Sequence, residues 1–181
     1  MNTTSTASNT DDDSINYNIS SEFNIDDNVV IEKASFEDME EILNLQKLAF
    51  ISEAEIHEDF SIKPLKQSLK EVQDEYKSRY FFKARFLDSN VIVGSIRIQI
   101  KKDTTCIEKL IVDPKWQGRG IAKKLLAFIE DKYKNNKFEL FTSHKSAKNI
   151  HLYKSIGYKV FKIEKESEKF YFIFFRKTNN F

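Results

Sequence analysis

Alternating apolar and polar residues predict seven β-strands along this chain. The clearest is the segment 91–100, where isoleucine occupies every second position from Ile96 to Ile100, the period of a strand with one buried face. The same reasoning predicts the other strands at 29–31, 80–87, 106–112, 138–141, 158–163 and 170–175. The strands on either side of the turn-forming residues 88–90 are expected to form a hairpin, as are the last two strands.

Apolar residues at helical spacing predict four helices. Ser35 is expected to cap the first helix, with Asp38 three residues later completing a capping box. Further helices are predicted at 65–76, at about 118–133 and at 146–156, where Gly157 ends the last one. The element order is therefore β-α-α-β-β-β-α-β-α-β-β, which predicts one mixed α/β (α+β) domain.

The first 27 residues differ in composition from the rest. They are rich in Asn, Thr, Ser and Asp and contain no Lys or Arg, so we expect residues 1–27 to be a disordered tail before a domain at 28–181. No apolar run approaches the ~20 residues of a membrane-spanning helix, and the N-terminus lacks the pattern of a secretory signal. A cytoplasmic protein is expected, with a nuclear location left open.

Charge and cysteine content narrow the candidate chemistry. Residues 1–100 carry 10 Lys and Arg against 19 Asp and Glu, whereas residues 101–181 carry 19 against 9. The basic second part favours an anionic ligand, although lysines that merely face solvent produce the same imbalance. Cys106 is the single cysteine, which excludes an internal disulfide, and the three histidines are scattered, so no metal site is expected.

The segment from Leu110 to Ala122 carries the strongest functional signal. An apolar strand ends in Asp-Pro, and Gly118 and Gly120 then open an amphipathic helix. Glycines let a ligand approach the backbone, and the first N–H groups of a helix attract anions, so this turn is suited to a diphosphate. No Walker sequence is present, and Lys123 stands where a dinucleotide-binding fingerprint has its third glycine. Two glycines alone also fit an ordinary strand-to-helix turn.

Two motifs in this chain resemble those of the GCN5-related N-acetyltransferase (GNAT) superfamily. The sequence QGRGIA at 117–122 is similar to the family pattern Arg/Gln-x-x-Gly-x-Gly/Ala, and Asn149, Tyr153 and Gly157-Tyr158 have the spacing of a second family motif. The resemblance covers roughly residues 29–177. It implies the GNAT fold, a mostly antiparallel mixed sheet of about seven strands flanked by about four helices.

The resemblance also implies where acetyl-CoA, the co-substrate, would bind. In the family the backbone of the glycine turn holds the pyrophosphate, and the main chain of the preceding strand pairs with the pantetheine arm. A bulge in that strand, which the sequence does not show, commonly opens the slot for the arm. Asn149 resembles a polar contact to the arm, although it fits a helix-surface amide too. The implied contacts are Leu110, Ile111, Val112, Gln117, Gly118, Arg119, Gly120, Ile121, Ala122 and Asn149.

The resemblance implies two candidates for the chemistry of acetyl transfer. Tyr153 matches a tyrosine that protonates the departing thiolate in many family members, and its alternative is a core tyrosine. Glu108 is the candidate general base, and its alternative is a residue on the solvent face. Direct attack needs no covalent intermediate, so Cys106 is interpreted as a strand residue. An acidic segment with Glu53, Glu55, Glu58 and Asp59 suits a cationic acceptor, although an exposed acidic segment has the same composition.

The predicted function is an acetyl-CoA-dependent N-acetyltransferase acting on a primary amine of a small molecule or a protein. No metal, nucleic acid or membrane partner is expected, and a homodimer is left open. A non-catalytic acyl-CoA-binding module is the alternative. A nucleic-acid binder using the basic second part is a third hypothesis, but its lysines are dispersed and no nucleic-acid motif is present.

Overall fold

The computed structural model describes residues 28–168 and 170–178, so the predicted tail lies outside the described residues. Seven strands form one sheet in the order β1-β2-β3-β4-β5-β7-β6. Every neighbouring pair is antiparallel except β4 and β5, which are parallel. The strands are β1 Val29–Lys33, β2 Tyr80–Phe86, β3 Ile92–Lys101, β4 Thr104–Val112, β5 Lys137–Ser143, β6 Lys159–Ser167 and β7 Phe170–Thr178. The predicted mostly antiparallel mixed sheet is confirmed.

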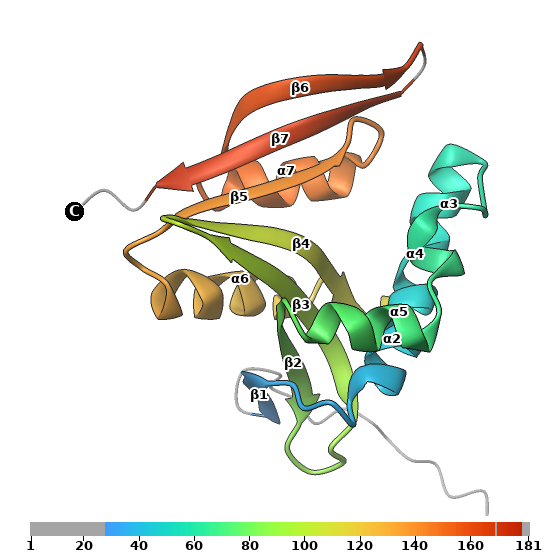
Figure 1. Cartoon of the computed structure of the whole chain (residues 1–181), viewed down its shortest axis with the longest axis vertical. Coiled ribbons are helices and arrows are strands. Elements are labelled where there is room, and N and C mark those ends of the chain that lie inside the picture. The colour runs from blue at the N-terminus through green and yellow to red at the C-terminus, as the bar shows by residue number, and fades with distance from the viewer. Residues whose placement is uncertain (1–27, 169, 179–181) are drawn as a thin grey trace, which may run out of the picture.

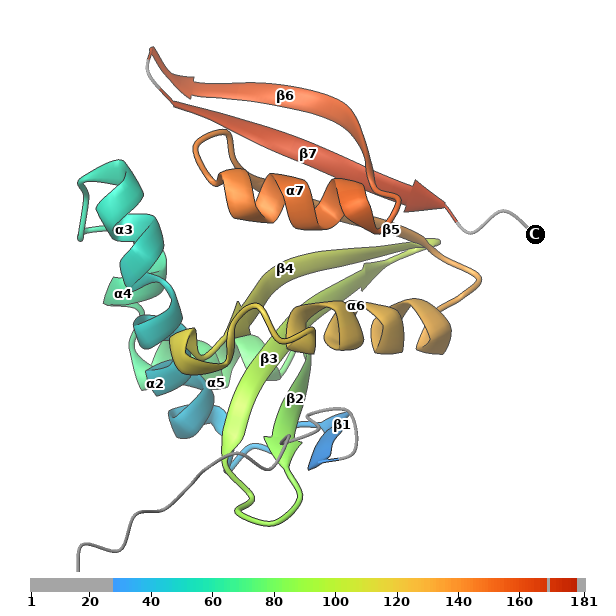
Figure 2. The same cartoon turned by 180° about the vertical axis from the view of Figure 1, so that it is seen from behind.

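Helices cover the sheet on both faces (Figures 1 and 2). The helices are α2 Met39–Ala49, α3 Ile51–His57, α4 Lys63–Lys66, α5 Leu69–Tyr76, the 3-10 turn η1 Pro114–Trp116, α6 Ile121–Lys132 and α7 Ala147–Ser155. Helices α2 and α5 pack on one face of the N-terminal part of the sheet, and α6 and α7 lie on the opposite face. No helix in the described part of the chain is both long and apolar enough to span a bilayer.

The helices of the N-terminal part differ from the prediction in three places. The predicted helix 65–76 is two helices, because Ser68 caps α5 in a capping box with Glu71 and breaks the chain direction after α4. The first helix begins at Met39 rather than after Ser35, because the Ser35 N–H donates to Asp38 Oδ2 at 2.7 Å and closes a turn. The segment predicted as the connection after it contains α3.

Two buried clusters hold the layers together. The larger lies under α6 and α7 and includes Leu125, Ile129, Phe138 and Phe175, all of them fully buried. The smaller lies under α2 and α5. The sheet separates these clusters, so the two faces of β4 contribute side chains to different cores.

A close approach between β3 and α6 fixes the start of that helix. A Cβ built on Gly94 would lie 3.1 Å from Ile121 Cγ2, 3.1 Å from Leu125 Cδ1 and 3.3 Å from the Ile111 carbonyl oxygen. We therefore expect Gly94→Ala to lower the free energy of unfolding by about 1–2 kcal/mol through overpacking, measured by urea denaturation. An unchanged denaturation midpoint would contradict this packing.

Candidate active site

Strands β4 and β5 separate partway along their length and leave a slot in the sheet. Their parallel pairing covers only Thr104–Ile107 against Lys137–Leu140. Beyond it, β4 continues to Val112 beside β3, and β5 continues to Ser143 beside β7. Figure 1 shows the two strands diverging towards α3. Within the part of the chain that the structure describes, the main chain of residues 108–112 therefore has a strand partner on one side only.

A β-bulge at Glu108 lies where the separation begins. Arg97 pairs with Lys109 and Ile98 with Ile107, so Glu108 is the extra residue in β4. A bulge bends its strand, which accounts for the departure of β4 from β5. It also interrupts the alternation of side chains, so that Glu108 and Lys109 both contact residues on the α5 side of the sheet. The sequence did not show this bulge, which was expected only from the resemblance to the family; the strand register reveals it.

The glycine turn lies at the end of β4, and its geometry is suited to an anion. Gly118 and Gly120 have φ of 76° and 87°, and a Cβ built on either would meet no atom within 4 Å. Helix α6 begins at Ile121, three residues later than predicted, and no side chain caps it. Its first N–H groups have no acceptor within the helix, and the helix dipole favours negative charge there. Residues 28–168 and 170–178 therefore leave the N–H donors of this turn uncovered.

Neighbouring side chains support this turn. Asp113 Oδ1 accepts the Lys115 N–H at 2.8 Å, and Gln117 Nε2 donates to the Val112 carbonyl oxygen at 3.2 Å. The Arg119 guanidinium lies 4.8 Å from the centre of the Trp116 ring. These contacts tie the turn to the end of β4 and leave a positive charge at the start of α6.

Tyr153 lies in the core between α7 and the sheet. Its side chain is 6% exposed, and its ring is 5.7 Å from that of Phe175 and 6.1 Å from that of Tyr158. Burial raises the pKa of the Tyr153 hydroxyl well above its usual range, and the charge of Glu53 raises it further. The hydroxyl is therefore protonated at neutral pH and is available as a donor.

Glu53 of α3 joins α7 at the open end of the slot. Its carboxylate accepts from Ser146 Oγ at 2.6 Å and from Asn149 Nδ2 at 3.2 Å, and it lies 3.8 Å from His57 Nε2. Asn149 Nδ2 also approaches Thr142 Oγ1 at 3.3 Å. The predicted cofactor contact Asn149 is thus held by two protein groups. The other three acidic residues of the segment, Glu55, Glu58 and Asp59, are exposed.

The side chain of Glu108 is bound by two arginines. Its Oε2 accepts from Arg79 Nε at 2.6 Å and lies 3.1 Å from Arg97 Nε. Arg97 is buried and also pairs with Glu75 of α5. The predicted base is therefore not on a solvent face, and both arginines contact the same oxygen of its carboxylate, Oε2.

Sequence reasoning missed Lys109, the next residue along β4. Its Nζ donates to Gln67 Oε1 at 2.6 Å, and Gln46 Nε2 donates to the same oxygen at 3.0 Å. Burial, reinforced by the charge of Arg97, lowers the pKa of Lys109 to about 7. Gln67 lies at the break between α4 and α5, inside the segment predicted as one helix, so no local pattern pointed to this contact.

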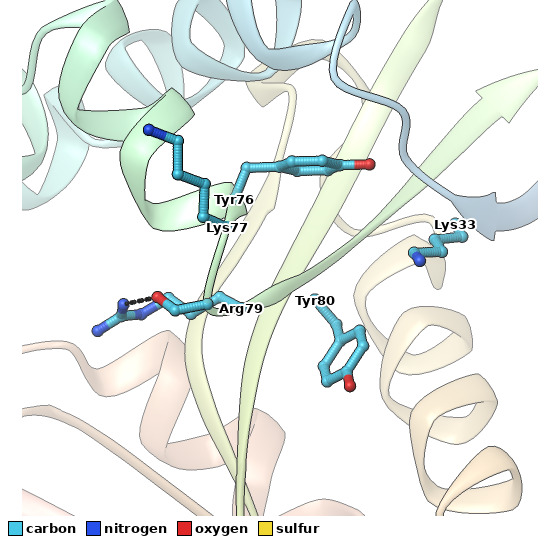
Figure 3. A pocket seen from close by; sticks show the side chains of 6 residues that line it. Lys33, Tyr76, Lys77, Arg79 and Tyr80 are labelled. Atoms are coloured by element: carbon cyan, nitrogen blue, oxygen red, sulfur yellow. Dashed lines mark hydrogen bonds between the residues drawn. The ribbon is translucent and has the colours of Figure 1, made fainter.

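A separate pocket of about 220 Å³ opens beside this polar cluster (Figure 3). Its lining residues are Lys33, Tyr76, Lys77, Ser78, Arg79 and Tyr80. Arg79 links the pocket to Glu108, but no residue of the slot or the glycine turn lines it. Ligand sites usually enclose ~300–1,000 Å³, so this pocket is not our candidate site. Among the described residues, no cluster of His, Cys, Asp and Glu is arranged to hold a metal ion.

Comparison with known proteins gives one family and many similar structures. Residues 45–179 match the profile of the acetyltransferase (GNAT) domain family. The PaiA N-acetyltransferase of Thermoplasma acidophilum, solved with coenzyme A, aligns with a TM-score of 0.65 at 18% identity over 81% of this chain and 97% of its own. The ribosomal-protein-S18-alanine N-acetyltransferase of Escherichia coli aligns with a TM-score of 0.67 at 16% identity, over 82% and 92%.

The spermidine/spermine N-acetyltransferase SpeG of Vibrio cholerae, solved with manganese ions, aligns with a TM-score of 0.63 at 16% identity, over 84% of this chain and 94% of its own. At these identities the structural matches show a shared fold. No curated protein sequence matches this chain.

Proposed function

The chain belongs to the acetyltransferase (GNAT) domain family, and we propose that it transfers an acetyl group from acetyl-CoA to a primary amine of a small molecule or a protein. One observation carries this proposal. The slot between β4 and β5 begins at the bulge and ends at the uncovered donors of α6. A long ligand with a polar, hydrogen-bonding arm and a diphosphate at one end fits that arrangement.

In this proposal the glycine turn binds the pyrophosphate. The backbone N–H groups from Gln117 to Ala122 would face the phosphates, with the positive end of the α6 dipole behind them. The main chain of Leu110, Ile111 and Val112 would form hydrogen bonds with the pantetheine arm, which would take the place of a neighbouring strand on that side of β4. The coenzyme A bound to the Thermoplasma acidophilum enzyme supports this choice of ligand.

Asn149 has a smaller part in the proposed complex. Its side-chain amide would turn towards the arm, in exchange for its present contact with Glu53. That exchange would also release Oε1 of Glu53, while Oε2 keeps its bond to Ser146, and the carboxylate could then attract the ammonium group of an incoming acceptor.

The chemistry would be direct attack of a neutral amine on the thioester carbonyl. Tyr153 would donate a hydrogen bond, and then its proton, to the departing sulfur. Glu108 is the candidate proton acceptor, at the bulge where the slot closes. Arg79 and Arg97 both contact Oε2 of this carboxylate, so Oε1 would be the oxygen that takes the proton from the attacking amine.

A CoA-binding module without turnover is the second candidate function. The two arginine contacts of Glu108 favour it, because they occupy the Oε2 atom of the candidate base. The two candidates share the slot and the glycine turn, so binding of coenzyme A does not separate them. Turnover does.

Thiol release from acetyl-CoA tests the proposed function. The full chain is incubated with acetyl-CoA and a panel of polyamines, amino acids, aminoglycosides and peptides, while binding of coenzyme A is measured by calorimetry. We expect saturable binding and a rise in thiol release with at least one amine class. Binding without any acceptor-dependent release would favour the binding module, and no binding at all would overturn both candidates.

A further inference from the structure

The proposed transfer mechanism leaves one buried amine without a role. Lys109 follows the bulge residue on the strand that lines the slot, and its side chain is largely enclosed between β4 and the α4–α5 connection. We propose that Lys109 is a self-acetylation site, whose ε-amine takes the acetyl group from acetyl-CoA bound in the slot of the same chain. This inference rests on the proposed function.

The topology places the reactive end of the ligand near Lys109. The phosphates would sit at the start of α6, beyond the C-terminal end of β4. The arm must then run back along β4, and it stops where β4 and β5 become paired, at Ile107 and Leu140. The acyl end therefore lies at the bulge, next to Glu108 and Lys109, whose side chains share one face.

The surroundings of Lys109 favour the neutral, nucleophilic form of its amine. Burial is the main reason why its pKa is lowered to about 7, and repulsion by Arg97 is the next. The carboxylates of Glu75 and Glu108 act in the opposite direction. The charged groups that face Lys109 from the neighbouring elements are Lys63 on α4, Glu71 and Glu75 on α5, Arg97 on β3 and Glu108 on β4.

A chain of hydrogen bonds makes the Lys109 amine a donor to Gln67, a bond that does not use its lone pair. Gln46 Nε2 donates to the Pro64 carbonyl oxygen at 2.8 Å and to Gln67 Oε1, which fixes the oxygen of Gln67 towards Lys109. The Lys109 amine therefore donates to Gln67, and its lone pair points elsewhere. The Nε2 group of Gln67 is buried and has no partner among the described residues. It therefore does not donate a hydrogen bond to the Lys109 amine.

The step balances without a further reagent. The lone pair of the neutral amine attacks the thioester carbonyl carbon, a C–N bond forms, and the C–S bond breaks. The amine loses one proton and the departing sulfur gains one, which leaves acetyl-lysine and free coenzyme A thiol. A protonated lysine has no lone pair and cannot take this step, which makes the charge state of the amine decisive.

Lys83 provides a matched comparison within the same chain. Its side chain is only 12% exposed, yet its Nζ lies 2.8 Å from Asp38 Oδ1 and 3.5 Å from Glu32 Oε1. Lys83 is thus ion-paired with two carboxylates, whereas Lys109 donates to the neutral amide of Gln67, and both are of intermediate exposure. We therefore expect Lys83 to stay unmodified. Comparing the acetylation of the two lysines therefore tests whether the partners of the amine, rather than its burial, decide the reaction.

The test uses the full chain with acetyl-CoA and no acceptor, followed over time by peptide mass mapping between pH 6 and pH 10. We expect acetylation of Lys109 at least about tenfold faster at pH 7.5 than of any exposed lysine, since an ordinary lysine with a pKa near 10.4 is only about 0.1% neutral there. The rate at Lys109 should rise with pH and level off above its pKa of about 7, whereas exposed lysines should keep accelerating. Lys109→Arg should lose this acetylation, and Gly120→Ala should slow it in parallel with its loss of coenzyme A binding.

Two outcomes would overturn the inference. If the wild-type chain acetylates an amine of the acceptor panel while Lys109 stays unmodified, self-acetylation is wrong and the proposed function stands. If Lys109 is modified at the same rate in Gly120→Ala, or no faster than Lys83, the reaction is adventitious chemistry with free acetyl-CoA. Absence of coenzyme A binding would instead remove the proposed function together with this inference.

Discussion

Replacing Tyr153 by phenylalanine should lower kcat by about 10²- to 10³-fold, in the range expected for loss of a general acid. The ring is packed against Phe175 and Tyr158, and phenylalanine preserves that packing. The change therefore removes a proton donor and little else. Steady-state kinetics with a saturating acceptor measures kcat, and calorimetry should show an affinity for coenzyme A within about twofold of wild type.

Tyr158→Phe is the matched control for this prediction. Tyr158 follows α7 and is buried beside Tyr153, with Lys177 Nζ 5.6 Å from the centre of its ring. Burial together with Glu130 raises the pKa of its hydroxyl. Its substitution should leave kcat unchanged. Equal losses in the two variants would mean that both tyrosines act through stability, and an unaffected Tyr153→Phe enzyme would remove Tyr153 from the chemistry.

Gly120→Ala should weaken binding of coenzyme A by roughly 10- to 100-fold. The αL conformation at φ 87° costs an alanine about 1–2 kcal/mol, and relief of that strain would turn the first N–H groups of α6 away from the phosphates. The added Cβ would project into the space that we assign to the ligand, where no protein atom lies within 4 Å. Titration calorimetry measures the change.

Gly157→Ala supplies a control with the same backbone strain elsewhere. Gly157 has φ 93° after α7, and a Cβ there would make an ordinary contact of 3.7 Å with Lys177. Both variants should lose similar thermal stability, but only Gly120→Ala should lose affinity. An equal loss of affinity in both would show that the effect is global rather than local to the turn.

Local patterns predicted the parts of the fold that local physics determines. The strand 91–100 and the helices after Gly120 and Ser146 have strong periodicity, and the structure has them close to the predicted bounds. The helix 65–76 was predicted wrongly because its apolar spacing outweighed the capping signal of Ser68 and Glu71. The glycine turn lies where its motif indicated, between β4 and α6.

The contacts that complete the candidate site join residues far apart in the sequence. Glu53 meets Asn149 across 96 positions, and Lys109 meets Gln67 across 42. Neither pair has a local signature, because each depends on which helix the sheet brings opposite which strand. The environment of Glu108 was likewise beyond prediction, since the bulge that aligns it with Arg97 is a property of strand pairing.

The brief parallel ladder between β4 and β5 has a mechanical consequence. Four residue pairs are the whole connection within the sheet between the section β1–β4 and the section β5–β7. One buried cluster under α6 and α7 contains residues of both sections, among them Ile96, Phe138 and Phe175, so side-chain packing joins them as well. A ligand arm bonded to the backbone on both sides of the gap would act as an eighth strand and add main-chain hydrogen bonds between the two sections.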